Sequence, residues 1–234
     1  MPNLRSMIYR EMPAVSVAEE LERDESAYRE AEQNGGESLR LWRPHQVTVV
    51  LGRGNNADLE VIVANCAADG VSVLRRTTGG GAVVLMPGCL CYSIIFDLEQ
   101  RLDLISAAET NRWVMTRLAA ALTRHSGEPV EVAGQSDLVI AGRKIGGSAQ
   151  RRGRRAILFH GSLLLAADQG RMDKYLQEPR RRPEYRGGRR HREFVRNTGW
   201  PVALAEKAIK ECLLIGEHLD FNIGNSHISR LFCD

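Results

Sequence analysis

The chain has 234 residues, of which 43% are hydrophobic and 26% are charged, as is ordinary for a globular protein. It contains no run of eighteen or more apolar residues, and its first fifteen residues lack the apolar stretch of a secretory signal. The composition therefore argues against a membrane or secreted protein and predicts a cytoplasmic one.

Arginines cluster in two places, although the formal net charge is only +3. One cluster lies at residues 151–155 and a denser one in the arginine-rich segment, residues 179–196. Such clusters occur on solvated surfaces or where an acidic partner or an anionic cofactor binds, and both interpretations stay open. A module that binds nucleic acid is less favoured, because only Tyr185 and Phe194 interleave the arginines and no known nucleic-acid fold is recognised.

The cysteines point to thiols that are buried or free. Five is an odd number, and they are scattered through mostly apolar surroundings, which is not typical of a disulfide framework or a zinc site. They are Cys66, Cys89, Cys91, Cys212 and Cys233.

The first predicted element is a helix. Ser16 and Glu19 have the spacing of a capping box, apolar residues then recur at helical spacing, and Gly35 ends the pattern. Asp24 falls on the apolar stripe, where a carboxylate is more often an edge or capping residue than a catalytic one. We therefore assign it no function.

Short strands and two further helices follow along the chain. Pro201 is well placed to open the last helix. The two strands around the turn-prone sequence RRGRR form a predicted hairpin. The predicted strands are 47–51, 71–74, 82–85, 90–96, 138–140, 144–150 and 156–165, and the predicted helices are 106–125 and 201 to about 219.

Runs of strands joined by hairpins, with helices between them, predict an α+β fold with a mostly antiparallel mixed sheet flanked by helices. A regular βαβ array is disfavoured. No internal repeat or low-complexity linker occurs, so we expect one domain over residues 1–234.

The strongest motif is the triple glycine, Gly79–Gly81, between two strand-like runs. Without Cβ atoms, such a loop lets a ligand approach the backbone N–H groups directly. Three glycines alone would more often form a bulge or a tight turn, but the preceding Arg75 and Arg76 shift the balance toward a binding site for an anion. The motif is not a P-loop, because no Gly-Lys-Ser/Thr follows and no helix begins there.

Two weaker motifs follow. In residues 134–150, Lys144 lies among small residues, so its ammonium group is free to meet a carboxylate or phosphate. An exposed hairpin lysine is nevertheless commonplace. In residues 159–165, His160 and Gly161 interrupt an apolar strand, and a lone histidine there would most often be a satisfied core residue.

Together with Leu51–Asn56, whose Gly-Arg-x-x-Asn pattern precedes them, these motifs resemble the lipoate-protein ligase A and octanoyltransferase family. This family shares its class II synthetase-like catalytic fold with biotin-protein ligase. The resemblance covers residues 45–165, and the order and spacing of four motifs make it far more specific than any one of them.

The resemblance implies an acyl pocket lined by the glycine loop, with Lys144 at the carbonyl or carboxylate of the acyl group. Asp137 matches the aspartate that the family associates with nucleotide and magnesium, and Arg53 is a candidate for phosphate contact. The residues expected to bind substrate are Arg75, Arg76, Thr78, Gly79, Gly80, Gly81, Gly147, Ser148, Ala149, His160 and Gly161.

The implied activity is that of an ATP-dependent ligase. With Mg²⁺, lipoic or octanoic acid would be joined to AMP, and the acyl group would pass to a lysine of a lipoyl domain or of the glycine-cleavage H protein. Because lipoyl domains tend to be acidic, we expect the arginine-rich segment to dock the acceptor, in particular Arg180–Arg182. The sequence does not distinguish among lipoate, octanoate and other acids as the substrate.

The chain departs from the family pattern at three places. Leu85 stands where the family usually has a histidine. Neither of the positions where octanoyltransferases carry a nucleophilic cysteine, 131–132 and 157–158, holds a thiol. An ATP-independent acyltransferase remains an alternative in which Cys89 or Cys91 would have to form the thioester. About seventy residues follow the last motif, so either an accessory domain is a separate polypeptide or full ligase activity is missing.

Overall fold

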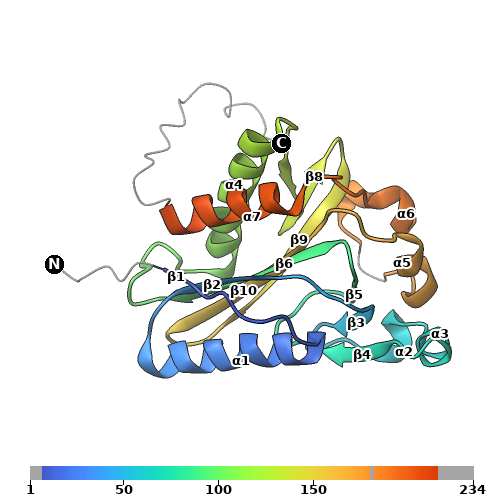
Figure 1. The fold of residues 1–234 in the computed structure, drawn as a ribbon, viewed down its shortest axis with the longest axis horizontal. Coiled ribbons are helices and arrows are strands. Elements are labelled where there is room, and N and C mark those ends of the chain that lie inside the picture. The colour runs from blue at the N-terminus through green and yellow to red at the C-terminus, as the bar shows by residue number, and fades with distance from the viewer. Residues whose placement is uncertain (1–6, 180–181, 216–234) are drawn as a thin grey trace, which may run out of the picture.

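The computed structural model describes residues 7–179 and 182–215 and contains two sheets (Figure 1). The larger sheet has seven strands in the order β1-β2-β6-β10-β9-β8-β7, and the smaller has the order β4-β3-β5. The strands are β1 (Ile8–Tyr9), β2 (Ser38–Trp42), β3 (Thr48–Leu51), β4 (Ser72–Arg75), β5 (Val83–Leu85), β6 (Cys89–Asp97), β7 (Glu131–Ala133), β8 (Asp137–Ile140), β9 (Arg143–Arg152) and β10 (Ala156–Leu164).

The helices flank these sheets. They are α1 (Val17–Asn34), α2 (Ala57–Glu60), α3 (Val63–Ala68), α4 (Ala107–Ser126), α5 (Gly170–Tyr175), α6 (His191–Phe194) and α7 (Val202–Lys210), with a 3₁₀ turn at Glu184–Arg186 and a π-helical turn at Glu211–Ile215. Helix α1 runs along one side of the larger sheet, α4 and α7 cover the other, and α5 and α6 lie near the small sheet (Figure 1).

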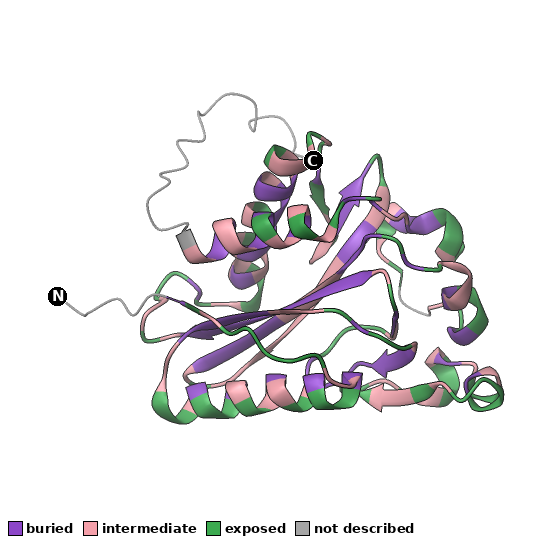
Figure 2. Ribbon diagram, viewed as in Figure 1, coloured by how far each residue is buried: buried purple, intermediate pink, exposed green. Residues whose placement is uncertain are grey.

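The pairing is antiparallel throughout both sheets except for β1 with β2 and β3 with β4. This confirms the predicted α+β class with a mostly antiparallel mixed sheet. Strand β6 is buried along its whole length, because helices cover both of its faces (Figure 2). Ile95 packs toward Tyr28 of α1, whereas Phe96 joins the core with α4.

The predicted first helix is confirmed. The Ser16 hydroxyl accepts a hydrogen bond from Glu19 N at 3.3 Å, and the Glu19 carboxylate accepts one from Ser16 N at 3.0 Å. The helix ends where Gly35 adopts φ +73°, a conformation that favours glycine. The predicted hairpin of β9 and β10 and the long helix α4 are also present.

Several elements were not predicted: β1, β2, β7 and the short helices α2, α3, α5 and α6. Strand β2 was missed because Arg40 interrupts its apolar pattern, yet the arginine is buried. The last predicted helix is shorter than expected, since α7 ends at Lys210 and continues only as the π-helical turn. Its predicted end near Leu219 lies outside the described residues.

Arg40 is buried because two carboxylates of α1 hold it. Its Nη1 donates to Glu20 Oε2 at 2.5 Å and its Nη2 to Asp24 Oδ1 at 2.6 Å, and the side chain is 5% exposed. All three charges are removed from water, so each depends on its partners. This cluster attaches α1 to β2.

Replacing Arg40 with Met should therefore lower the free energy of unfolding by about 3–5 kcal/mol, because two buried carboxylates lose their cation. The matched control is Arg10→Met, since Arg10 pairs with Glu30 at 3.5 Å with both side chains about half exposed. The control should cost at most about 1 kcal/mol. Urea unfolding at pH 7 measures both values, and equal losses would contradict the buried-cluster argument.

Candidate active site

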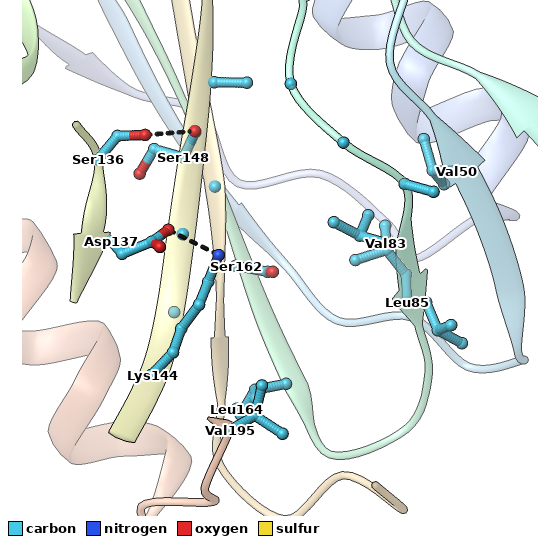
Figure 3. Close-up of a pocket in the computed structure, with 18 of the residues that line it drawn as sticks. Val50, Val83, Leu85, Ser136, Asp137, Lys144, Ser148, Ser162, Leu164 and Val195 are labelled. Atoms are coloured by element: carbon cyan, nitrogen blue, oxygen red, sulfur yellow. Dashed lines mark hydrogen bonds and ion pairs between the residues drawn. The ribbon is translucent and has the colours of Figure 1, made fainter. Parts of the chain in front are cut away.

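A pocket of about 710 Å³ lies between the larger sheet and the smaller one (Figure 3). Strands β9 and β10 form one wall, from which Lys144 and Ser162 point inward, whereas the Ser148 hydroxyl turns to Tyr92 and Met115 on the other face of the sheet. Val50 of β3 and Val83 of β5 lie on the facing wall. The two walls come from segments far apart in the chain, so only the folded structure creates the pocket.

The wall built by the smaller sheet is apolar. Val50, Val83 and Leu85 line the pocket there and pack in one cluster with Leu21 and Cys91. Leu85, which replaces the histidine expected from the family pattern, is buried in this cluster. Leucine in place of histidine makes this side of the pocket more hydrophobic, which suits a hydrocarbon chain.

Lys144 brings a cation to the opposite wall. Its Nζ lies 2.6 Å from Asp137 Oδ1, and the Tyr185 hydroxyl donates to Asp137 Oδ2 at 2.7 Å. Burial, followed by the hydrogen bond and charge of Asp137, raises the pKa of Tyr185 far above its ordinary value. The lysine side chain is 29% exposed, so a ligand in the pocket can reach the ammonium group.

Gly147 makes room for this ion pair. A Cβ atom at this position would lie 2.7 Å from Lys144 Nζ and 2.9 Å from Asp137 Oδ1. Both distances are shorter than van der Waals contact allows. Residue 147 must therefore be a glycine if the Lys144 side chain is to keep this position.

Arg76 shapes the glycine loop. Its Nη2 donates to Gly79 O at 2.6 Å and to Gly81 O at 2.8 Å, and its Nη1 donates to Val50 O at 3.3 Å. Burial lowers the pKa of Arg76 to about 10, which leaves the guanidinium charged at neutral pH. The loop carbonyls thus point toward a buried cation.

Arg75 organises the preceding turn rather than the pocket. Its Nη1 donates to Gly52 O at 2.9 Å and to Asn55 O at 2.7 Å. The backbone N–H of Arg53 in the same turn donates to Thr78 O at 2.8 Å. Neither Arg53 nor Arg75 lines the pocket, and both are exposed.

Asp24 is a site residue that the sequence reasoning missed. It lines the pocket, and its Oδ2 accepts from His160 Nδ1 at 2.9 Å, while His160 Nε2 lies 2.7 Å from Thr78 Oγ1. Burial by itself raises the pKa of Asp24, but the hydrogen bond from His160 and the charge of Arg40 outweigh it and hold the pKa below its usual range. A carboxylate on the apolar stripe of a helix was the available signal, because such a group must find a partner when it is buried.

Most of the residues expected at the site come together around the pocket. Thr78, Gly79, Arg53 and Arg75 do not line it. Those that line the pocket are Arg76, Gly80, Gly81, Asp137, Lys144, Gly147, Ser148, Ala149, His160 and Gly161.

The arginine-rich segment also borders the pocket. Arg186 lines it, is buried, and lies 4.9 Å from the centre of the Phe194 ring. Arg189 donates to Gly142 O at 2.9 Å, and Arg196 N donates to Lys144 O at 2.9 Å. Arg189 and Arg196 therefore attach this segment to the start of β9 and to Gly142 just before it, whereas Arg182, Arg190 and Arg192 are exposed. Arg180 and Arg181 lie outside the described residues.

The cysteines near the pocket are poor nucleophiles. Cys89 and Cys91 are each 2% exposed, and Cys91 lines the pocket. Burial raises the pKa of Cys89 to about 11 and that of Cys91 well above its usual value. Because the thiolate is the reactive form, neither side chain is prepared to form a thioester.

In residues 7–179 and 182–215, no three His, Cys, Asp or Glu side chains gather as a metal-binding group. No helix in the same ranges has the length and apolar character needed to cross a bilayer.

A comparison with known sequences finds a relative of part of the chain. A Mycoplasma pneumoniae protein named "Probable lipoate-protein ligase A" is 35% identical over 129 residues, which are 55% of this chain and 37% of that protein. The chain thus aligns with little more than a third of this relative's length.

Solved structures show the same fold at low sequence identity. A bi-partite lipoate protein ligase from Thermoplasma acidophilum, described with its E2 lipoyl domain, superposes with a TM-score of 0.77 at 23% identity, covering 94% of this chain and 86% of that one. A lipoate-protein ligase A bound with ATP gives 0.71 at 23% identity, covering 82% and 77%. Residues 16–198 match the family described as the lipoyl protein ligase A/B catalytic domain, and the chain belongs to this family.

Proposed function

We propose that the protein is a cytoplasmic lipoate-protein ligase-like enzyme, which activates lipoate or octanoate with ATP and transfers the acyl group to a lysine of a lipoyl-domain protein. The observation that carries this proposal is the pocket itself, whose apolar wall faces the Lys144 ammonium group. A fatty acid has the same division into an apolar chain and an anionic head. The proposal is also supported by the similar proteins, which are named as lipoate-protein ligases.

The acyl chain would bind along Val50, Val83 and Leu85. Burying a methylene group contributes roughly 0.8 kcal/mol, so about six buried methylenes would give about 5 kcal/mol of favourable binding energy. A carboxyl head beside Lys144 adds a charge-assisted hydrogen bond of about 1.5–3 kcal/mol. The chain therefore supplies most of the affinity, and the lysine fixes the position of the reacting carbonyl.

Lys144 would also stabilise the reaction. Negative charge develops on the carbonyl oxygen as the acceptor amine attacks, and a fixed ammonium group lowers the energy of that charge. The amine forms an amide bond to the carbonyl carbon, AMP leaves with the electron pair of the broken bond, and the amine loses its proton. Asp137 holds Lys144 in place before substrate binds.

ATP supplies a good leaving group, because a free carboxylate does not react with amines. The carboxylate oxygen would attack the α-phosphorus of ATP, pyrophosphate would leave, and the acyl group would then be joined to AMP. The cations Lys144, Arg182 and Arg186 line the pocket and suit an anionic phosphate chain. Mg²⁺ usually takes one or two carboxylates together with phosphate oxygens and water. Asp137, with its carboxylate at the pocket, would be the protein ligand of this ion.

The ATP-independent acyltransferase is the weaker candidate. It would need a thiol to carry the acyl group between carrier proteins, and the burial of Cys89 and Cys91 disfavours both. Binding of nucleic acid is weaker still, because the arginines Arg186 and Arg189 are turned into the protein.

The test is reconstitution from purified components. The protein, lipoate, ATP, Mg²⁺ and a lipoyl domain should together give an acceptor whose mass increases by one lipoyl group, and octanoate should give the octanoyl product. Omitting ATP should abolish the increase. Modification that proceeds only from an acyl carrier protein, without ATP, would instead establish the acyltransferase.

Gly81 offers a direct test of the acyl pocket. It lines the pocket, has no unusual backbone angle, and a Cβ atom there would meet nothing within 4 Å. Gly81→Val should weaken lipoate binding by roughly tenfold or more while leaving the melting temperature unchanged, because only a ligand would meet the added methyl groups.

Gly54→Val is the matched control, since a Cβ atom at Gly54 also meets nothing within 4 Å and this residue lies outside the pocket. Isothermal titration calorimetry gives the affinity and differential scanning calorimetry the stability. Equal lipoate affinity in both variants would place the ligand elsewhere.

The acceptor would be a lipoyl domain or the glycine-cleavage H protein. We further propose that residues 1–234 form one catalytic domain. The T. acidophilum relative is itself described as bi-partite and is paired with an E2 lipoyl domain. An acidic acceptor would meet the exposed arginines beside the pocket.

Reversing two of these charges, Arg190→Glu with Arg192→Glu, should slow acylation of an acidic lipoyl domain several-fold at low salt and much less at high salt. Exposed charges are screened within about 10 Å at 0.1 M salt, so docking of this kind depends on ionic strength. The control is the reversal of Arg112 and Arg124 on α4, a helix that contributes no residue to the pocket. An equal effect of both double reversals, or one independent of salt, would contradict docking at the arginine-rich segment.

A further inference from the structure

A chain of hydrogen-bonded side chains runs from α1 to the glycine loop. Asp24 Oδ2 lies 2.9 Å from His160 Nδ1, His160 Nε2 lies 2.7 Å from Thr78 Oγ1, and Thr78 Oγ1 lies 3.0 Å from Arg76 Nε. Arg76 then donates to the carbonyl oxygen of Gly81 at 2.8 Å. Each member is at most partly exposed, and Thr78 is fully buried.

One arrangement of protons gives every donor and acceptor in this chain a partner. The ionised Asp24 carboxylate only accepts, so His160 Nδ1 carries a proton. Arg76 Nε only donates, so the Thr78 oxygen accepts from it. In the part of the protein that the structure describes, the hydroxyl proton of Thr78 has no acceptor other than His160 Nε2, and this bond requires Nε2 to be unprotonated. Neutral His160 with its proton on Nδ1 satisfies every atom of the chain.

Arg76 needs this arrangement because it has no ionic partner. Among the described residues, no carboxylate forms an ion pair with its guanidinium group, which donates only to backbone carbonyls and to Thr78. The hydroxyl of Thr78 is therefore the one side-chain acceptor that orients it within the described structure. A wrongly protonated His160 would present a second donor to that same oxygen.

We propose that Asp24 is a positioning residue of the pocket, which fixes the tautomer of His160 and thereby, through Thr78 and Arg76, the conformation of the glycine loop. The effect on acyl binding rests on the proposed function, but the effect on the tautomer and the loop does not. The family resemblance assigned no part to this carboxylate.

Two isosteric variants separate this role from simple charge compensation. Asp24→Asn presents an amide that can donate to His160 Nδ1, which drives the proton to Nε2 and breaks the chain. Glu20→Gln removes an equal negative charge from the other side of Arg40 but contacts neither His160 nor the pocket. Both variants leave Arg40 with one carboxylate, so they are matched in charge and closely matched in shape.

The direct measurement is the histidine nitrogen spectrum by NMR at pH 7.5 on the full chain, with backbone amide shifts of Gly79–Gly81 recorded in parallel. Wild type and Glu20→Gln should show His160 protonated on Nδ1. Asp24→Asn should show the Nε2-protonated form and shifted glycine amides. Its lipoate affinity should fall about tenfold or more, since groups that act through a binding residue commonly matter by 10–100-fold, while that of Glu20→Gln changes by less than threefold.

A wild-type His160 protonated on Nε2, or on both nitrogens, would overturn the proposal, as would equal losses of affinity in the two variants. If Asp24→Asn does not fold, Thr78→Val should shift the glycine amides and Thr78→Ser should restore them, and unchanged amides in Thr78→Val would overturn it. If wild type binds neither lipoate nor octanoate, the proposed function fails, while the tautomer and the glycine amides still decide the role of Asp24.

Discussion

Lys144→Ala is expected to lower kcat/KM for transfer of the lipoyl group by about 100-fold or more, a loss typical of removing one group that stabilises the developing oxyanion. The substitution removes the ammonium group that, in the proposed function, meets the carbonyl oxygen of the acyl group. Lipoate binding should weaken less than the rate, because the apolar wall with Val83 and Leu85 is intact. The rate is measured by acceptor mass spectrometry under single-turnover conditions.

The fold should survive this change. Lys144 packs little apolar surface, and Asp137 keeps its hydrogen bond from Tyr185. A partly exposed ion pair contributes at most about 1 kcal/mol, so the melting temperature should change little.

The chain contains a matched control for Lys144→Ala. Lys174 forms an ion pair with Asp69 at 2.5 Å, and the Tyr175 hydroxyl donates to the same carboxylate. This Lys-Asp-Tyr group is outside the pocket. Lys174→Ala should therefore leave acylation at the wild-type rate, and comparable loss in both variants would show that Lys144 acts only through stability.

Gly147→Ala is expected to be the second most damaging change for activity, with at least a tenfold lower kcat/KM and little change in stability. The added methyl group would press against Lys144 Nζ and Asp137 Oδ1, at 2.7 and 2.9 Å. The end of a lysine side chain moves easily, so the clash is relieved by displacing the amine. A displacement of about 1 Å in a reacting group can cost on the order of 100-fold in rate.

Replacing the neighbouring glycine, Gly146, should instead lower the stability of the fold. A Cβ atom at Gly146 would lie 2.7 Å from Ser162 O, a backbone atom of β10 that cannot move without disturbing the sheet. Gly146→Ala should therefore lower the free energy of unfolding by about 1–3 kcal/mol. Thermal unfolding and the acylation rate, measured on both variants, test the distinction, and similar stability losses in the two would contradict it.

The architecture was largely accessible from sequence because its signals are local. The capping box at Ser16, the helical spacing in 107–126 and the hairpin around Gly153 each depend on neighbouring residues. Strand β2 was not accessible in this way. Its central residue, Arg40, is charged and breaks the apolar pattern of a buried strand. Only the carboxylates of α1 that pair with this arginine explain its burial.

The same division holds at the site. The glycine loop and Lys144 could be named because glycine spacing and an isolated lysine are visible in the chain. The sequence predicted that Arg75 and Arg76 bind an anion or line the pocket, but it did not reveal that their guanidinium groups donate to backbone carbonyls of the loop and the preceding turn. Which atoms an arginine meets depends on backbone brought near by folding.

Residue order alone was enough to specify the three longest helices, most of the strands, the family motifs and the chemical types at the pocket, because periodicity and glycine content act over a few neighbouring positions. Only the three-dimensional arrangement decided that Asp24 meets His160, 136 positions later, and that the arginine-rich segment borders Lys144. Such contacts depend on how sheets and helices pack against one another, and burial then requires each charged or polar group to find a partner that no local pattern reveals.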